Sequence, residues 1–402
     1  MKLGIDVSTY LEELEHGARY SDGSGKVIDP LDEFISNGVT GMRIRLWVYP
    51  RSEKGEPYLA GNCDIQNFIR LATLAQRKGF SIMLDFHYSD FWADPRKQGV
   101  SKTWHYKTPE DLMQLTYSYT KETLKTIRAN GISLKYIQVG NEITNGMLWP
   151  YGRLIEQPDK SRTNYETFTK LLKAGIRACR EEMPDAAVIL HLEKSNDQFI
   201  HNEFLTKMEE YCVDYDIIGY SYYPYWHGTM QDLFANTEQA KRFRKRQMIV
   251  ETAYAFTGKD YMDEPGVPNN LAVNDDNLET LKQAGFIHEY PFTPAGQKKF
   301  ISDFLQEAKK HGIESVYWWE PLWIPGPGIC WATPDAMLYT GDTPKAARNE
   351  WSNQCLVDYN GRKLPAFDAF SVKDKWKQQR QRGERGNQHS DQAQKNTQRK
   401  TP

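Results

Sequence analysis

Short apolar runs alternate with longer amphipathic segments eight times along this chain of 402 residues. The runs have the length of buried strands, and they span residues 3–7, 42–48, 81–86, 136–140, 187–192, 216–220, 247–250 and 315–319. Between the second and third runs, apolar residues recur at helical spacing, at Ile65, Phe68, Ile69 and Ala72. Eight strands that are each followed by a helix match the count of a (β/α)8 barrel. The pattern therefore predicts an α/β protein built as a single TIM barrel.

Residues at helix boundaries support the predicted helices. Thr108 suits an N-cap, Pro109 suits the first helical position, and acidic residues occupy the first turn. Glycines at positions 38, 79, 131 and 312 are suited to end a helix before the next strand. Further helices are expected over residues 164–182, 230–245, 294–311 and 366–376. We therefore assign residues 1–376 to one barrel domain.

The end of the chain differs in composition from the rest. The total net charge is −2, but residues 377–402 are rich in Lys, Arg and Gln and nearly lack apolar side chains. Such a segment cannot bury enough surface to fold, so we predict a disordered basic tail over residues 377–402. The remainder of the chain is then acidic, and this argues against nucleic acid as a partner.

The five cysteines show no CxxC or other metal-binding spacing. We predict buried free thiols, with one Cys330–Cys355 bridge as the alternative. No apolar run approaches the roughly 20 residues that span a membrane. Residues 3–7 read as a strand rather than as a signal peptide. We therefore expect either an intracellular protein or one whose leader is absent from the sequence.

Every predicted strand ends in polar or aromatic side chains. In a (β/α)8 barrel, catalytic groups gather at the carboxyl ends of the strands. Those positions hold Asp6, Arg45, Asp85 with His87, Asn141 with Glu142, His191 with Glu193, Tyr222 with Tyr223, Glu251, and Trp319 with Glu320. A purely structural barrel would not need such groups on every strand, so we expect one functional site at this end of the barrel.

Glu142 and Glu251 each follow an apolar run, where a carboxylate is costly unless it has a function. Two such carboxylates on separate strands suggest the acid/base and the nucleophile of a sugar-cleaving enzyme. Glu142 would need a raised pKa to donate a proton, and an apolar setting near a second carboxylate would raise it. The adjacent Asn141 amide could bind a substrate hydroxyl. The alternative is that both glutamates only cap strands at a polar rim.

Other strand-end residues suit supporting roles around the two glutamates. Glu251 would have to stay ionised to attack a sugar carbon. We expect Arg45 and a tyrosine of the sixth strand, Tyr222 or Tyr223, to hold it in that form, because hydrogen bonds to a charged group favour the charged form. His87 could bind a sugar hydroxyl or tune a carboxylate, with a structural role as the alternative.

Most of the 11 tryptophans follow strand ends, at positions 47, 92, 104, 149, 226, 319, 323 and 331. The flat apolar face of tryptophan suits a sugar ring, so this rim predicts a groove for a polymer. The histidines lack paired metal spacing, and residues 274–277 lack the pattern of a calcium-binding loop. We therefore predict no required cofactor or metal, and a solvated loop at 274–277.

Several segments resemble the glycoside hydrolase family 53 endo-β-1,4-galactanases. The two most specific are LDFHYSDFWADP at 84–95 and VGNEITNGMLWP at 139–150. Shorter matches are GIDVS at 4–8, RIRLWV at 43–48, SYYP at 221–224, IVETAY at 249–254, WEP at 319–321, WSNQ at 351–354 and LPAF at 364–367. The resemblance covers residues 3–372, nearly the whole predicted barrel.

The resemblance implies an endo-acting, retaining hydrolase of β-1,4-galactan in pectic side chains that works by double displacement. It implies that Glu142 is the acid/base and Glu251 the nucleophile. Combined with the strand-end and tryptophan candidates, the supporting set is Asp6, Arg45, His87, Trp92, Asn141, Tyr222, Tyr223, Trp319 and Trp331. A polymeric plant substrate leads us to expect a secreted or cell-surface monomer whose partner is a polysaccharide.

Two departures from the family pattern are visible. Some members bind calcium through closely spaced Asp, His and Asn after the seventh strand, and residues 263–270 lack this pattern. Trp318 stands where the family usually has a tyrosine, which could alter a sugar contact. Two alternatives stay open: the same mechanism on another β-1,4 polymer such as mannan or glucan, and a catalytically silent carbohydrate-binding protein. The presence of both glutamates and Arg45 argues against the silent protein.

Overall fold

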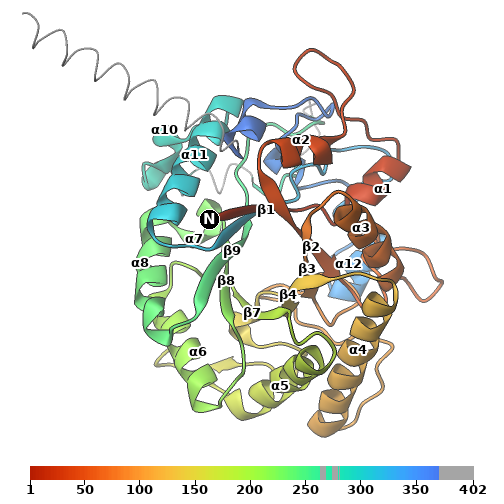
Figure 1. Ribbon diagram of the computed structural model, residues 1–402, viewed down its shortest axis with the longest axis vertical. Helices are drawn as coiled ribbons and strands as arrows, with labels where there is room; N and C mark the ends of the chain where they lie inside the picture. Colours follow the sequence, from red (N-terminus) through yellow and green to blue (C-terminus); the bar gives the residue numbers. More distant parts are fainter. Residues whose placement is uncertain (263–268, 274–278, 280, 371–402) are drawn as a thin grey trace, which may run out of the picture.

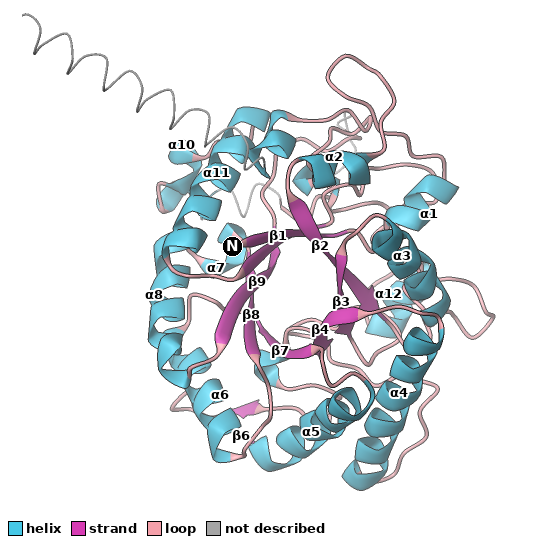
Figure 2. Cartoon of the chain, in the orientation of Figure 1, coloured by secondary structure: helices cyan, strands magenta, loops and turns pink. Residues whose placement is uncertain are grey.

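The computed structural model describes residues 1–262, 269–273, 279 and 281–370. Eight parallel strands close into a barrel in the order β1-β10-β9-β8-β7-β4-β3-β2, and Figure 1 shows helices around its outside. Figure 2 separates the strands at the centre from the helices in the outer ring. The predicted (β/α)8 barrel is therefore confirmed. Within the described residues, no helix has the length and apolar character to cross a membrane.

The barrel strands lie close to the predicted apolar runs. Their bounds are β1 Lys2–Asp6, β2 Val39–Leu46, β3 Ser81–Phe86, β4 Leu134–Val139, β7 Ala187–Leu192, β8 Ile217–Tyr222, β9 Arg246–Thr252 and β10 Ser315–Trp319. The largest difference is in β2, which begins at Val39 because its pairing with β1 starts there, opposite Leu3. Outside the barrel, β5 (Ile155–Glu156) and β6 (Arg162–Thr163) form a small antiparallel sheet.

The helices follow the strands as predicted. Among the described residues, the α-helices are α1 Tyr10–Glu15, α2 Pro30–Ser36, α3 Ile65–Arg77, α4 Pro109–Ala129, α5 Tyr165–Glu182, α6 Gln198–Glu210, α7 Pro224–His227, α8 Met230–Ala240, α10 Phe286–Glu289, α11 Pro294–Lys310 and α12 Pro334–Thr340. Thr108 caps α4 in a capping box with Asp111. The helix predicted over 230–245 is shorter, because α8 ends at Ala240 and a 3₁₀ turn, Lys241–Phe243, follows.

The last described segment differs from its prediction. Residues Pro365–Phe370 form a 3₁₀ helix instead of the start of an α-helix. The tighter turn places Phe367 and Phe370 on one face, where their rings lie 4.1 Å and 6.3 Å from the ring of Phe34. The rest of the predicted helix, the domain boundary after residue 376 and the predicted tail lie outside the described residues.

Tyr317 of β10 fills the part of the barrel opposite the predicted site. A Cβ atom at Gly4 would lie 2.3 Å from the Tyr317 ring, and one at Gly41 would lie 2.5 Å from its hydroxyl. The ring packs in a buried interior cluster with Met83, Tyr136, Ile189, Ile217, Met248 and Val250. Packed side chains therefore close this part of the barrel, so the site is positioned at the carboxyl ends of the strands.

We expect Gly4→Ala to lower the free energy of unfolding by about 1–3 kcal/mol, because the added methyl group overpacks a buried ring. Urea unfolding of both chains measures the change. Gly23→Ala is the matched control, since a Cβ there would meet no heavy atom within 4 Å. Equal unfolding midpoints for the two variants would contradict the packing argument.

All five cysteines are free thiols. The prediction of free thiols is confirmed, and the alternative bridge between Cys330 and Cys355 is wrong. The Cys355 thiol instead donates to the backbone oxygen of Trp323 at 3.2 Å. The prediction of burial is wrong for Cys212, which is exposed because it lies in the turn after α6.

Candidate active site

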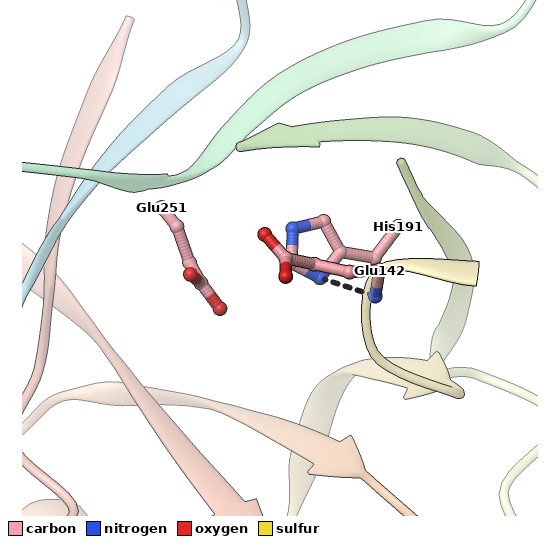
Figure 3. A group of neighbouring side chains, drawn as sticks. All are labelled: Glu142, His191 and Glu251. Atoms are coloured by element: carbon pink, nitrogen blue, oxygen red, sulfur yellow. Dashed lines mark hydrogen bonds between the residues drawn. The ribbon is translucent and has the colours of Figure 1, made fainter. Parts of the chain in front are cut away.

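Glu142 and Glu251 face each other at the open end of the barrel. Glu142 lies just beyond β4, and Glu251 is near the end of β9. A carboxylate oxygen of each and a ring nitrogen of His191 all lie within 4.8 Å of one another, and Figure 3 shows the two carboxylates extending toward the same space. Glu142 has a φ of 49°, in the left-handed region that non-glycine residues rarely adopt. The structure thus brings together the two residues that the sequence singled out.

The carboxylate of Glu251 is held by a cation and a phenol. Nη1 of Arg43 lies 2.8 Å from Oε1, and the Tyr223 hydroxyl donates to Oε2 at 2.9 Å. Burial raises the pKa of Glu251 to about 7, and the charge of Arg43 and the hydrogen bond from Tyr223 limit that rise. Both contacts favour the ionised form of Glu251.

Arg43, and not the predicted Arg45, holds Glu251. Nη1 of Arg45 lies 2.5 Å from Glu320, and Nη2 donates to the backbone oxygen of Ala60 at 2.8 Å. The two arginines are two residues apart on β2, so both face the barrel interior. Arg43 starts one layer deeper in the barrel, and from there its guanidinium contacts Glu251. The predicted contact of Arg45 with Glu251 is therefore wrong, because the arginine that reaches Glu251 lies within β2 rather than at its end, although Arg45 does line the cleft.

The choice between Tyr222 and Tyr223 is decided by strand alternation. Tyr223 faces the site through its bond to Glu251. The Tyr222 ring stacks on Phe304 of α11 with centroids 5.2 Å apart, and its hydroxyl donates to the backbone oxygen of Gly228 at 3.1 Å. Tyr222 therefore packs between the barrel and its helices, and its predicted place in the site is wrong.

Glu142 has a different setting from Glu251. The Ser221 hydroxyl, on β8, lies 2.6 Å from Oε1 of Glu142. Burial raises the pKa of Glu142 well above its usual value, and the negative charges of Glu251 and Glu193 raise it further. The hydrogen bond from Ser221 opposes this rise. Glu142 is therefore the better proton donor of the two carboxyl groups.

Asn141 and His87 line the cleft, but their polar atoms are largely occupied. Oδ1 of Asn141 accepts from Nη2 of Arg43 at 2.9 Å, and its Nδ2 donates to the backbone oxygen of Ala93 at 2.8 Å. His87 Nε2 lies 3.0 Å from Asp85, and Nδ1 accepts from the Ala93 backbone N–H at 3.0 Å. Both His87 nitrogens are therefore engaged, which leaves neither for a sugar hydroxyl, and the contact with Asp85 fits the predicted role of tuning a carboxylate.

Asp6 contacts Arg43, the residue that holds Glu251. It is fully buried at the end of β1. Its Oδ2 lies 2.7 Å from Nη1 of Arg43, the same nitrogen that contacts Glu251. Asp6 thus fixes the arginine that holds Glu251.

The two glutamates open into a cleft of about 810 Å³. Five tryptophans line it, namely Trp92, Trp226, Trp319, Trp331 and Trp351. Trp92 and Trp331 stack with centroids 4.7 Å apart, and the guanidinium of Arg45 lies 4.5 Å from the Trp92 ring. Trp226, whose ring lies 6.4 Å from that of Trp351, is 47% exposed. A cleft lined by aromatic rings suits an extended sugar chain.

Four of the eight predicted rim tryptophans lie elsewhere. Trp47 and Trp323 are fully buried in the core. Trp104 packs against Tyr119 of α4 with centroids 5.5 Å apart. Trp149 donates through Nε1 to the backbone oxygen of Asn145. Position after a strand end therefore did not separate core tryptophans from cleft tryptophans.

A family model described as glycosyl hydrolase family 53 matches residues 2–370 of the chain. The chain belongs to glycosyl hydrolase family 53. The resemblance seen in its motifs is therefore confirmed, and the protein is an enzyme of the glycosidase class.

Relatives in family 53 span nearly the same length. An endo-beta-1,4-galactanase of Bacillus subtilis is 30% identical over 387 residues, which is 91% of this chain and 84% of the relative. An arabinogalactan endo-beta-1,4-galactanase A of Aspergillus niger is 27% identical over 351 residues, 85% of this chain and 90% of the relative. The solved family 53 catalytic domain of Ignisphaera aggregans is 35% identical, with a TM-score of 0.78 over 92% of this chain and 95% of that domain.

Trp318, which departs from the family 53 pattern, lies away from the cleft that holds Glu142 and Glu251. Trp318 is 1% exposed. Its ring packs against Phe300 of α11 and Phe370, with centroids 6.4 Å and 6.2 Å away. The expectation that Trp318 alters a sugar contact is therefore wrong. Two predictions concerned calcium: that residues 263–270 lack a calcium-binding pattern and that 274–277 is a solvated loop. Residues 263–268 and 274–277 lie outside the described residues.

Glu142, His191 and Glu251 are close enough to be considered as metal ligands. However, Nε2 of His191 lies 2.8 Å from Ser221 Oγ, and Nδ1 lies 2.9 Å from Asn141 Oδ1. Both ring nitrogens therefore already have protein partners. The donor set fits a hydrogen-bonded acid/base pair better than a cation site.

Three residues of the site were not predicted from the sequence: Arg43, Ser221 and Trp351. Arg43 and Ser221 carry a usable signal, because each lies two residues before a predicted site residue and so faces the same side of its strand. Trp351 carries no such signal, since it lies in the long segment after β10 and α12.

Proposed function

We propose that this family 53 enzyme is an endo-β-1,4-galactanase that cleaves galactan by double displacement with retention of configuration. The observation that carries the proposal is the pair Glu142 and Glu251. Their oxygens approach within 4.8 Å of one another, which suits the roughly 5–5.5 Å carboxyl spacing of retaining enzymes better than the roughly 6.5–9.5 Å of inverting ones.

In the first step, an ionised Glu251 attacks the anomeric carbon while Glu142 donates its proton to the departing glycosidic oxygen. Arg43 and Tyr223 keep the attacking carboxylate ionised and oriented. Because the pKa of Glu142 is raised by burial and by the charge of Glu251, the proton shared by the pair resides on Glu142. The products of this step are a covalent glycosyl-enzyme and the released part of the polymer.

In the second step, the ionised Glu142 takes a proton from a water molecule, whose oxygen attacks the anomeric carbon. The bond between Glu251 and the sugar breaks, and Glu251 leaves as a carboxylate. Glu142 ends protonated, so the enzyme returns to its starting state. Two inversions at one carbon give net retention.

The substrate class is proposed from the cleft and from the relatives. Five tryptophans line the cleft beside the two glutamates, and such a set can contact several sugar units. Relatives at 30% and 27% identity are named as galactanases, so we propose galactan chains of pectic polysaccharides as the substrate. Because such a polymer lies outside cells, we propose a secreted or cell-surface enzyme.

We expect the enzyme to release reducing ends from linear β-1,4-galactan and not from β-mannan or carboxymethyl cellulose. Early products should be oligosaccharides of mixed length, as internal cleavage requires. Proton NMR during the first minutes should show the new reducing end in the β-configuration. Cleavage of mannan instead would overturn the substrate, and an initial α-anomer would overturn the retaining mechanism.

A further inference from the structure

The Ser221 hydroxyl is shared between Glu142 and His191. Ser221 and His191 are both fully buried. Oγ of Ser221 lies 2.6 Å from Oε1 of Glu142 and 2.8 Å from Nε2 of His191. A hydroxyl has one hydrogen to donate and two lone pairs that accept. Ser221 can therefore donate to either neighbour and accept from the other.

His191 is a neutral imidazole. Burial lowers the pKa of His191 well below its usual value, and the positive charge of Arg43 lowers it further. A neutral ring has one N–H and one bare nitrogen. His191 can therefore either donate to Ser221 through Nε2 or accept from it there, according to which nitrogen carries the hydrogen.

The surroundings of His191 Nδ1 suit both forms of the ring. Gln138 Nε2 lies 3.0 Å away and can donate to a bare Nδ1, while Asn141 Oδ1 lies 2.9 Å away and can accept from Nδ1–H. Both amide orientations are fixed, because Arg43 donates to the oxygens of Gln138 and Asn141. The backbone N–H of Glu142 also points at Nδ1 from 3.4 Å (Figure 3).

We propose that Ser221 is a two-way positioning residue that supports Glu142 in both of its protonation states, with His191 completing the hydrogen bond on the other side. When Glu142 is ionised, His191 Nε2–H donates to Ser221 and Ser221 donates to the carboxylate. When Glu142 is protonated, it donates to Ser221, Ser221 donates to bare Nε2, and Nδ1–H donates to Asn141. Between the two states His191 releases a hydrogen to solvent from one ring nitrogen and takes one up from solvent at the other, while Ser221 keeps its single hydrogen. In total only Glu142 gains or loses a proton.

This inference rests on the proposed function, in which Glu142 acts as an acid in one step and as a base in the next. The groups that face Glu142 come from five parts of the chain: Glu251 on β9, His191 on β7, Glu193 just after β7, Asp94 after β3, and Ser221 with Tyr223 on and after β8. The carboxylates among them raise the pKa of Glu142, and the Ser221 hydrogen bond lowers it.

Ser221→Ala should reduce kcat on galactan by roughly tenfold to a hundredfold, the effect of losing one charge-assisted hydrogen bond. The hydrogen bond from Ser221 stabilises the ionised form of Glu142 more than the protonated form, so its loss should raise the pKa of Glu142. The alkaline limb of the pH–kcat profile should therefore move upward by about one pH unit. Ser221→Thr, which keeps a hydroxyl, should return the limb to its wild-type position. An unmoved limb in Ser221→Ala would mean that Ser221 only packs, and would overturn the proposal.

A second measurement is independent of turnover. Nitrogen-15 NMR of histidine-labelled enzyme, with His191→Gln to identify the signal, reports which ring nitrogen carries the hydrogen. We expect His191 to carry its hydrogen on Nδ1 at pH values where Glu142 is protonated and on Nε2 where Glu142 is ionised. In Glu142→Gln, whose side chain cannot titrate, the same His191 tautomer should persist at every pH. The same form at every pH in the wild type would overturn the proposal. A wild-type enzyme that fails to cleave galactan would overturn the proposed function instead, so the two failures are distinguishable.

Discussion

Glu251→Gln should lower kcat on galactan by at least about ten-thousandfold, since it removes the nucleophile of a covalent mechanism. The amide has the shape of the carboxylate, and its single oxygen can keep one of the two contacts, because Arg43 and Tyr223 contact different oxygens of Glu251. An amide oxygen is too weak a nucleophile to form the glycosyl-enzyme. The fold should therefore persist while the chemistry stops.

Reducing-end release and a urea unfolding curve test this together. Glu314→Gln is the matched control, because Glu314 accepts from Tyr136 and lies before β10, at the opposite end of the barrel. That variant should keep its activity. Glu251→Ala with added azide should yield an α-galactosyl azide, formed by one inversion. If Glu251→Gln kept roughly a hundredth or more of the wild-type rate, the role of nucleophile would belong to another residue.

Arg43→Met should lower the free energy of unfolding by about 3–5 kcal/mol, because it leaves buried carboxylates without their cation. Arg43 is 0% exposed. Its guanidinium nitrogens lie 2.7 Å from Asp6, 2.8 Å from Asp85 and 2.8 Å from Glu251. Few single substitutions in this chain would unbalance as much buried charge. Chemical unfolding gives the change directly.

Arg43→Lys isolates the effect of Arg43 on catalysis, since it keeps a positive charge that permits folding. A lysine ammonium is compact and cannot bridge three carboxylates as a guanidinium does. Arg43 lowers the pKa of Glu251, so weakening the contact should raise that pKa. Glu251 must be ionised to attack, and the acidic limb of the pH–kcat profile should therefore move to higher pH, by about one unit.

Arg45→Lys is the matched control for that shift. Arg45 contacts Glu320, Ala60 and, at 3.8 Å, Asp6, whereas the ion pair to Glu251 comes from Arg43. The acidic limb should therefore stay at its wild-type position even if substrate binding weakens. If Arg45→Lys moved the limb and Arg43→Lys did not, the assignment of Arg43 to Glu251 would be wrong.

The barrel was predictable because its signals are local. Each strand is a short apolar run, and each boundary residue acts within one helical turn, as Thr108 does at the start of α4. Helix ends were less predictable. The segment after Pro365 forms a 3₁₀ helix because Phe367 and Phe370 pack on Phe34, a residue more than 300 positions earlier in the chain.

The residues of the site were likewise only partly predictable from the sequence. Asn141 and the two glutamates were located from the sequence, since the barrel fold brings all strand ends to one rim. Trp351 was missed because it reaches the cleft from a segment without regular periodicity. Trp47 and Trp323 were assigned to the rim and are fully buried in the core, because exposure depends on how the loops pack against one another.

The sequence by itself determined the (β/α)8 barrel, the family and the identity of the two facing carboxylates, because strand periodicity and strand-end position follow from the local order of residues. Only the tertiary structure decided that Arg43 rather than Arg45 holds Glu251, that Tyr223 rather than Tyr222 faces it, and that Ser221 joins His191 to Glu142. The physical reason is the length and freedom of side chains. Neighbouring residues on one strand begin within a few ångströms of each other, and their partners are set by which buried charge or hydroxyl on another strand they can reach.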